Sequence, residues 1–319
     1  MKKSTKTVLS IISYALILCI GIVVIPRFFR ASGDDVSEQD ATGEIVYDSV
    51  SLSAPVYPSS PGIEVTENKH ATIDFSNTSQ GYISITYIGA SAGDAVAKIN
   101  YGETEFIYTL SGDEDVLPLN RGNGKYTVRV YQMLGSGQYK SVLTKNLSVE
   151  LENQLLPYLY PSRLVNYKPE SLAVEYADRI CAGIGSDLEK LQMIYSYIVE
   201  NITYDYKKAA NVESGYIPSV DSTYITKTGI CYDYSVMLAS MLRSQCIPVK
   251  LVMGYLNGTT IFHAWNEIYL EDSGWVTVNI YLDEGTFSML DTTLSVSQGD
   301  EEISKKLGDP EVYLPTYRY

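Results

Sequence analysis

After residue 58, the first half of the chain alternates apolar and polar positions with a period of two, in short runs separated by turn residues. Such alternation is typical of strands that turn one face to a core and the other to water. Short strands at this spacing predict an all-β, immunoglobulin-like sandwich over residues 59–152. The predicted strands cover residues 71–75, 82–87, 95–101, 105–110, 126–132 and 141–151.

The pattern changes to a helical period after residue 152. Ser186 and Glu189 have the spacing of a capping box, and the apolar residues between 188 and 202 fall on one helical face. A second helical run follows Gly229, which places Cys231 at or next to a helix N-terminus. Strand-like runs come next, so residues 153–319 are predicted to form an α+β domain. These strands are expected at residues 249–255, 262–270, 275–282 and 287–290.

An apolar run over residues 8–25 follows three lysines at the start of the chain. Its length of about 18 residues is near the minimum for a helix that crosses a bilayer. We expect residues 1–30 to form a transmembrane signal anchor, with the rest of the chain outside the cell. A cleaved signal peptide and secretion are the alternative, since both segments share a basic, apolar and small-residue plan. Residues 31–58 are acidic and rich in serine, as expected of a solvated linker.

Charge and residue counts narrow the range of partners and ligands. The chain has 319 residues, of which 24 are basic and 38 acidic, and its net charge of −14 argues against nucleic acid as a partner. With two histidines and no Cys-x-x-Cys spacing, the sequence offers no evident metal-ligand set, so we expect neither a metal nor another cofactor. Cys181 and Cys246 can either pair or remain buried free thiols, and the second alternative is favoured.

Cys231 and His263 are the residues most suited to catalysis. A cysteine at a helix N-terminus meets the positive end of the peptide dipoles, which favours the thiolate. A thiolate that attacks a carbonyl carbon needs a partner that holds its proton and later delivers it to the leaving amine. His263 is the only histidine in the C-terminal half. The two residues are therefore candidates for a nucleophile and a general base.

Several short motifs in the C-terminal half follow one another in a distinctive order. They are Thr228-Gly229-Ile230-Cys231-Tyr232-Asp233-Tyr234-Ser235, Ile247-Pro248-Val249, Gly254-Tyr255 and His263-Ala264-Trp265-Asn266-Glu267, with Ile202-Thr203-Tyr204-Asp205 upstream. This ordered set resembles the transglutaminase-like superfamily of papain-related thiol enzymes. The resemblance implies a Cys-His-Asp triad that contains Cys231 and His263. It also implies acyl-transfer chemistry, which means cross-linking, deamidation or peptide hydrolysis.

The third member of the implied triad has two candidates. The family places an aspartate on the strand after the histidine strand, four residues beyond an aromatic residue. Asp291 fits this spacing after Phe287, and Asn279 fits it after Trp275 with an amide in place of the carboxylate. Asp291 is favoured. Asn279 stays an alternative, because an amide oxygen can also accept a hydrogen bond from the imidazole N–H.

These features predict a cell-surface thiol enzyme that acts on a protein or peptide substrate, with cell-wall material as one candidate. Tyr204, Tyr232 and Trp265 are candidates for lining its cleft. The alternative is a non-catalytic surface module that binds wall polymer or protein. Retention of both Cys231 and His263 argues for the enzyme, because a pure binding module does not need the pair. An intracellular protein is disfavoured, since the apolar run lies at the extreme N-terminus behind lysines.

Overall fold

The computed structural model describes residues 50, 52–89, 93–135, 137–256, 262–278, 280–283, 286–289 and 313–319. The predicted signal anchor and most of the predicted linker lie outside these residues. Among the helices of the described part, none is both long and apolar enough to span a membrane.

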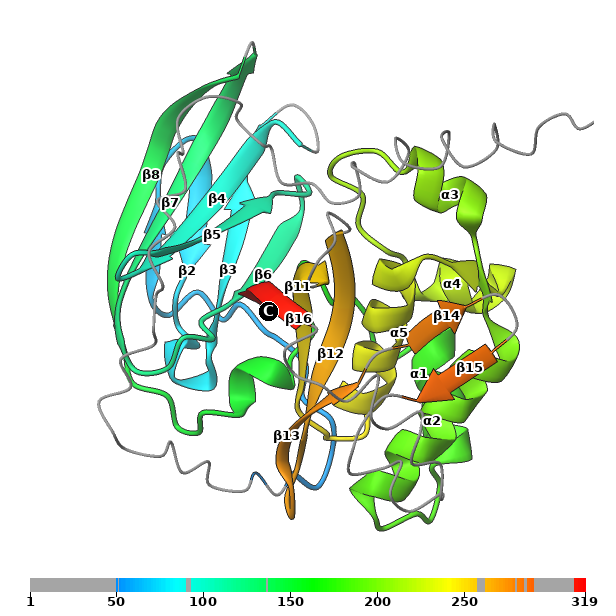
Figure 1. The fold of residues 1–319 in the computed structure, drawn as a ribbon. Helices are drawn as coiled ribbons and strands as arrows, with labels where there is room; N and C mark the ends of the chain where they lie inside the picture. The colour runs from blue at the N-terminus through cyan, green and yellow to red at the C-terminus, as the bar shows by residue number, and fades with distance from the viewer. Residues whose placement is uncertain are drawn as a thin grey trace, which may run out of the picture.

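The N-terminal part of the described chain is rich in β-structure and forms two four-stranded antiparallel sheets (Figure 1). One sheet has the order β1-β2-β3-β6, with β1 Val65–Glu67, β2 Ala71–Asp74, β3 Tyr82–Tyr87 and β6 Glu114–Pro118. The other has the order β5-β4-β7-β8, with β5 Thr104–Thr109, β4 Ala95–Tyr101, β7 Gly124–Gly135 and β8 Gln138–Val149. Alternate residues such as Ile73, Ile85, Ile99 and Val128 are buried in one common core. The period-two pattern thus reflects burial of one face, and β3 and β4 have the predicted bounds.

The hydrophobic pattern does not predict β1 or β6. Strand β6 is hard to recognise because it begins with two acidic residues, the second of which is buried. Arg163 Nε lies 3.2 Å from Asp115 Oδ1, and the Ser111 N–H donates to Asp115 Oδ2 at 2.7 Å. These partners allow a carboxylate to occupy a buried position of β6. The apolar residue by which the sequence pattern would reveal a buried strand position is therefore absent.

The C-terminal half has an α+β core, as predicted. Its helices are α1 Leu172–Ile180, α2 Asp187–Asn201, α3 Tyr206–Asn211, α4 Val220–Thr226 and α5 Cys231–Arg243. The main antiparallel sheet has the order β13-β12-β11-β16, with β11 Val249–Leu256, β12 Phe262–Leu270, β13 Gly274–Val278 and β16 Tyr313–Arg318. Smaller elements are β9 Thr203–Tyr204, β10 Thr228–Gly229, β14 Ile280–Asp283, β15 Thr286–Met289 and the short 3-10 helices Thr78–Gln80 and Leu156–Tyr158. Figure 1 shows the main sheet between the helices and the β-rich region.

Helix α5 is the central element of this half. Every residue from Tyr232 to Arg243 is buried, and the helix packs against β11, β12, α1, α2 and α4. Cys231 is its first residue, which confirms the predicted helix start. The predicted cap of α2 is also present, since the Ser186 hydroxyl accepts from the Glu189 N–H at 3.4 Å.

Arg243 fixes the C-terminal end of α5 in the interior. Its guanidinium donates to the Val249 carbonyl from Nε at 3.1 Å and from Nη2 at 2.6 Å, and to the Tyr160 carbonyl from Nη1 at 2.7 Å. Burial lowers the pKa of Arg243 to about 10, which still leaves the group charged at neutral pH. The side chain therefore ties α5 to β11 and to the segment that leads from the β-rich region.

Strand β16, which the hydrophobic pattern does not predict, links the main sheet to the β-rich region. The carbonyl of Arg318 accepts from the Asn120 side chain at 2.8 Å. The Tyr319 ring packs on Phe106 and Tyr108, each with ring centroids 5.7 Å apart. Pro315 within the strand obscures it in the sequence, but β16 is an edge strand, where proline is tolerated.

We expect Gly254→Ala to weaken the docking of β16. A Cβ atom at residue 254 would lie 2.2 Å from the Leu314 carbonyl oxygen and 2.8 Å from Pro315 Cα, and backbone atoms cannot move aside as a flexible side chain can. The free energy of unfolding should fall by about 1–3 kcal/mol, the usual range for overpacking. Urea denaturation measures the change. Gly185→Ala is the matched control, because a Cβ atom there meets no atom within 4 Å, and an equal loss in both variants would contradict the prediction.

Candidate active site around Cys231

A short parallel bridge holds the segment that leads into Cys231. Strand β10 pairs with β9, and the Asp205 N–H donates to the Gly229 carbonyl at 2.8 Å. A Cβ atom at residue 229 would lie 2.7 Å from Asp233 Cβ, so glycine is needed for the first turn of α5 to fold back on this segment. Cys231 then begins α5 as a half-buried residue.

Opposing influences act on the Cys231 sulfur. Burial is the largest and raises the pKa of the thiol, and the Asp233 carboxylate raises it further. The backbone N–H groups of Ala264, Tyr232 and Cys231 itself act in the other direction. The resulting pKa is about 11, so this environment holds a protonated thiol at neutral pH. The helix N-terminus does favour the thiolate, as expected, but burial outweighs it.

His263 lies on the neighbouring strand. It is the second residue of β12, pairs with Gly254 of β11 and is half-buried. Its ring is nearly parallel to that of Trp265, with centroids 6.3 Å apart. Because the next residue, Ala264, directs its N–H at the Cys231 sulfur, the fold brings the segments of the predicted nucleophile and base together.

The two candidates for the third triad position, Asp291 and Asn279, lie outside the described residues. Strand β13 ends at Val278 and β14 begins at Ile280. Because β13 belongs to the main sheet and β14 pairs with β15 in another, the predicted strand over residues 275–282 is two strands.

The three aromatic candidates for the cleft differ in exposure. Tyr204 is half-buried and makes an edge contact with Tyr206, at a centroid distance of 4.9 Å. Tyr232 and Trp265 are both only 2% exposed. The Trp265 ring packs on Tyr313 at 5.1 Å. Tyr204 is thus the candidate with surface available to a ligand.

The other described cysteines do not form a second reactive centre. Both are free thiols, as favoured from the sequence, but only Cys181 is buried as expected, and Cys246 is half-buried. Burial raises the pKa of each. Within the described part of the chain, no three side chains are grouped as a metal site would require.

Sequence reasoning overlooked a polar network at the first turn of α5. The Asp233 carboxylate accepts from Lys208 Nζ at 2.8 Å, from the Ile230 N–H at 2.8 Å and from the Tyr216 hydroxyl. Its side chain is fully buried. The one available signal was an acidic residue two positions after the cysteine, inside an otherwise enclosed helix.

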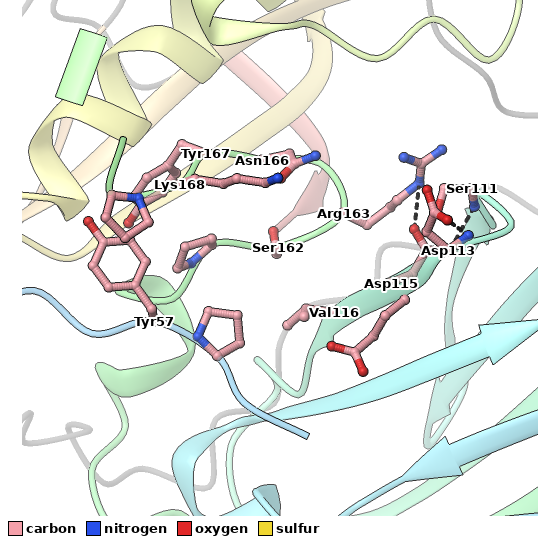
Figure 2. Close-up of a pocket in the computed structure, with 14 residues that line it drawn as sticks. Tyr57, Ser111, Asp113, Asp115, Val116, Ser162, Arg163, Asn166, Tyr167 and Lys168 are labelled. Carbon is pink, nitrogen blue, oxygen red and sulfur yellow. Dashed lines mark hydrogen bonds and ion pairs between the residues drawn. The ribbon is translucent and has the colours of Figure 1, made fainter. Parts of the chain in front are cut away.

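A hollow of about 580 Å³ lies elsewhere, between β6 and the loop over residues 161–169. Figure 2 shows the Asp115–Arg163 ion pair on one side of it and Tyr57 and Tyr167 on the other. Its lining includes neither Cys231 nor His263. The hollow is therefore not the predicted catalytic cleft.

A cysteine at the start of an enclosed helix, beside a strand that carries a histidine, defines this half as an α+β domain with a thiol site. Residues 174–280 match the sequence model of the Transglutaminase-like superfamily. This part of the chain is a transglutaminase-like domain, which confirms the resemblance drawn from its motifs.

The individual proteins to which the chain is similar share little sequence identity with it. The chain is 27% identical over 227 residues to the uncharacterized protein YebA of Bacillus subtilis (strain 168), in a match that covers 62% of this chain and 29% of that one. A candidate cysteine protease from Cytophaga hutchinsonii is similar in structure over 81% of this chain and 74% of its own, with 14% identity and a TM-score of 0.39. Red sea bream transglutaminase is similar over 62% of this chain and 47% of its own, with 12% identity and a TM-score of 0.25. The chain thus spans less than a third of the length of the curated relative.

We expect Asn266→Ala to loosen α5 from the main sheet. The buried Asn266 Nδ2 donates to the Ser235 carbonyl of α5 at 3.1 Å and to the Lys250 carbonyl of β11 at 3.3 Å. Loss of these bonds in the interior should lower the free energy of unfolding by about 1–3 kcal/mol, as measured in urea. Asn211→Ala is the matched control, since Asn211 also donates to a carbonyl but is exposed, and it should change little. Equal losses in the two variants would argue against this role of Asn266.

Proposed function

We propose that the transglutaminase-like domain is a thiol enzyme acting on amide bonds of proteins or peptides, with Cys231 as nucleophile and His263 as general base. One observation supports this most directly: the Cys231 sulfur lies beside the N–H of Ala264, the residue that follows His263. The half-buried state of both residues leaves each partly open to solvent. A nucleophile and a base on adjoining elements are the minimum that acyl transfer through a thioester requires.

In the proposed reaction, the His263 imidazole takes the proton of the Cys231 thiol, and the thiolate attacks the carbonyl carbon of an amide. The π electrons of the carbonyl move to its oxygen, where backbone N–H groups at the start of α5 stabilise the negative charge. The C–N bond then breaks, the amine leaves with the proton from His263, and a thioester remains on Cys231. Transfer of the acyl group to an amine gives a cross-link, and transfer to water gives deamidation or hydrolysis.

The third group of the proposed triad is Asp291, whose carboxylate would accept from the imidazole N–H and hold the ring in the required tautomer. Asn279 is the alternative. The two differ in charge, because a carboxylate stabilises the imidazolium that forms during the reaction more strongly than an amide does.

We also propose that the enzyme acts at the cell surface. The apolar run over residues 8–25 supports an N-terminal membrane anchor, and the polar linker after it supports an exported position for an immunoglobulin-like sandwich and the thiol domain. Cell-wall protein or peptide is the corresponding candidate substrate. Protease accessibility of the C-terminal half on intact cells tests this placement, since a protected domain would contradict it.

A non-catalytic binding module is the second candidate function. The observation in its favour is the pKa of about 11 that the surroundings of Cys231 impose, because a thiol that stays protonated is a weak nucleophile. The two functions therefore differ in whether His263 stabilises the Cys231 thiolate enough to offset the effect of burial on its pKa.

Alkylation of Cys231 over a range of pH separates the two functions. In an enzyme, an imidazolium at His263 stabilises the thiolate, so the midpoint of alkylation in the wild-type chain should lie well below 11. In His263→Gln, which lacks the imidazolium, the midpoint should rise, because burial and Asp233 then disfavour the thiolate without an opposing cation. Iodoacetamide labelling of the full-length protein, with mass spectrometry of the peptide that contains Cys231, gives the midpoint.

Two variants serve as controls for this measurement. Cys231→Ala should remove the labelled peptide while Cys19, Cys181 and Cys246 remain as background thiols. His70→Gln removes the other histidine of the chain and should leave the midpoint unchanged. If the midpoint of Cys231 alkylation lies near 11 in the wild type and does not move in His263→Gln, the result contradicts the enzyme proposal and favours the binding module.

The same labelling assay tests the third triad position. We expect Asp291→Ala to lower the alkylation rate of Cys231 at pH 7 by about tenfold or more, because loss of the carboxylate weakens the imidazolium that stabilises the thiolate. Asn279→Ala should change the rate by less than about twofold. The reverse order of the two effects would assign the position to Asn279.

A further inference from the structure

The network around Asp233 places a buried negative charge close to the predicted nucleophile. Asp233 lies two residues after Cys231 in the first turn of α5, and its side chain has no solvent exposure. It caps the helix by accepting from the Ile230 N–H at 2.8 Å, and it also accepts from the Tyr216 hydroxyl. The carboxylate therefore holds the turn that carries the sulfur in place.

The same charge opposes the chemistry proposed for Cys231. A carboxylate near the sulfur disfavours a second negative charge there, and this effect is strong where water is excluded. Two charged groups meet at this turn, Asp233 on α5 and Lys208 on α3, and the Tyr216 hydroxyl after α3 donates to the same carboxylate. His263 is the titratable group on β12, the strand packed against α5. Lys208 supplies the cation that faces Asp233, with Nζ 2.8 Å from Oδ2.

The chain positions Lys208 for this contact through a second anchor. Asp205 caps α3 by accepting from the Lys208 N–H at 2.8 Å, and its own N–H donates to the Gly229 carbonyl at 2.8 Å. Strand β10, which contains Gly229, ends two residues before Cys231. The ammonium group thus reaches Asp233 from a segment that is fixed to the entrance of α5.

From this geometry we propose that Lys208 is a positioning residue for the thiol site, which offsets the Asp233 charge beside Cys231 and holds α3 against the first turn of α5. This inference rests on the proposed role of Cys231 as nucleophile. It assigns a function to a lysine that lies on a different helix from the cysteine.

The test compares two adjacent lysines of α3 by the alkylation of Cys231 in the full-length protein. Lys208→Met should lower the rate at pH 7 by about fivefold or more and shift the midpoint to higher pH, because the Asp233 charge is then uncompensated. Lys207→Met removes the same charge from the same helix at an exposed residue and should leave the rate within about twofold of wild type. Equal effects of the two substitutions would overturn the proposal.

The direction in which Asp233→Asn changes the alkylation rate distinguishes an effect of charge from an effect of lost packing. If charge controls the thiol, Asp233→Asn raises the alkylation rate at pH 7 while Lys208→Met lowers it. Loss of packing alone would move both variants in the same direction, and that result would also overturn the proposal. Lys208→Arg keeps the charge and should stay within about twofold of wild type.

A second comparison keeps the test decisive if Lys208→Met does not fold, as judged by circular dichroism. In the Asp233→Asn background the carboxylate is absent, so adding Lys208→Met should then change the rate by less than about twofold. A large further loss would contradict the proposed action through Asp233. The readout needs no substrate, so failure here is distinct from failure of the enzyme proposal, which depends on the midpoint shift in His263→Gln.

Discussion

Because α5 is enclosed by the main sheet and by α1, α2 and α4, its polar side chains can find partners only inside the protein, and the Tyr232 hydroxyl is buried without one among the described residues. The Ser240 hydroxyl donates to the Val236 carbonyl at 2.8 Å within the helix. Asp233 and Arg243 reach outward, to α3 in one case and to β11 and Tyr160 in the other. The enclosure of a single helix thereby dictates contacts across most of the C-terminal half.

Burial also determines the protonation state of the Cys231 thiol. A sulfur at a helix N-terminus receives backbone donors, but burial, even where it is partial, disfavours a negative charge on the sulfur. For Cys231 burial prevails and the pKa is about 11. Reactivity at neutral pH then has to come from a neighbouring cation, and this requirement makes the nearby segment of β12 with His263 central to the proposed chemistry. The same burial would strengthen the pair once formed, since charges attract more strongly where water is scarce.

Much of this arrangement could be predicted because its signals are local. Strands β3, β4 and β12 have the bounds that the hydrophobic pattern predicts, Ser186 caps α2, and Cys231 begins α5. Periodicity, a capping residue and a glycine before a helix each act within a few residues. The order of the motifs was sufficient to identify the transglutaminase-like domain.

Two of the missed strands, β6 and β16, depend on partners distant in sequence. Strand β16 contains Pro315 and gains its place from pairing with β11. Strand β6 tolerates Asp115 because Arg163 comes from another segment. The link between Lys208 and Asp233 likewise joins two helices, and nothing in the local sequence of either indicates it. Such pairs become visible only when the fold brings the segments together.

The charged residues at the two ends of α5 both interact favourably with the helix dipole, but they affect the thiol site differently. Asp233 in the first turn and Arg243 in the last turn both complement the helix dipole, which stabilises the helix. At the C-terminal end the complement is harmless, since the guanidinium donates to the Val249 and Tyr160 carbonyls and has no thiolate to oppose. At the N-terminal end the carboxylate competes with the thiolate for the same positive potential. A helix that is both enclosed and capped by an acid can therefore present a reactive sulfur only if a cation offsets that acid, and α3 is the element that brings Lys208 to this position.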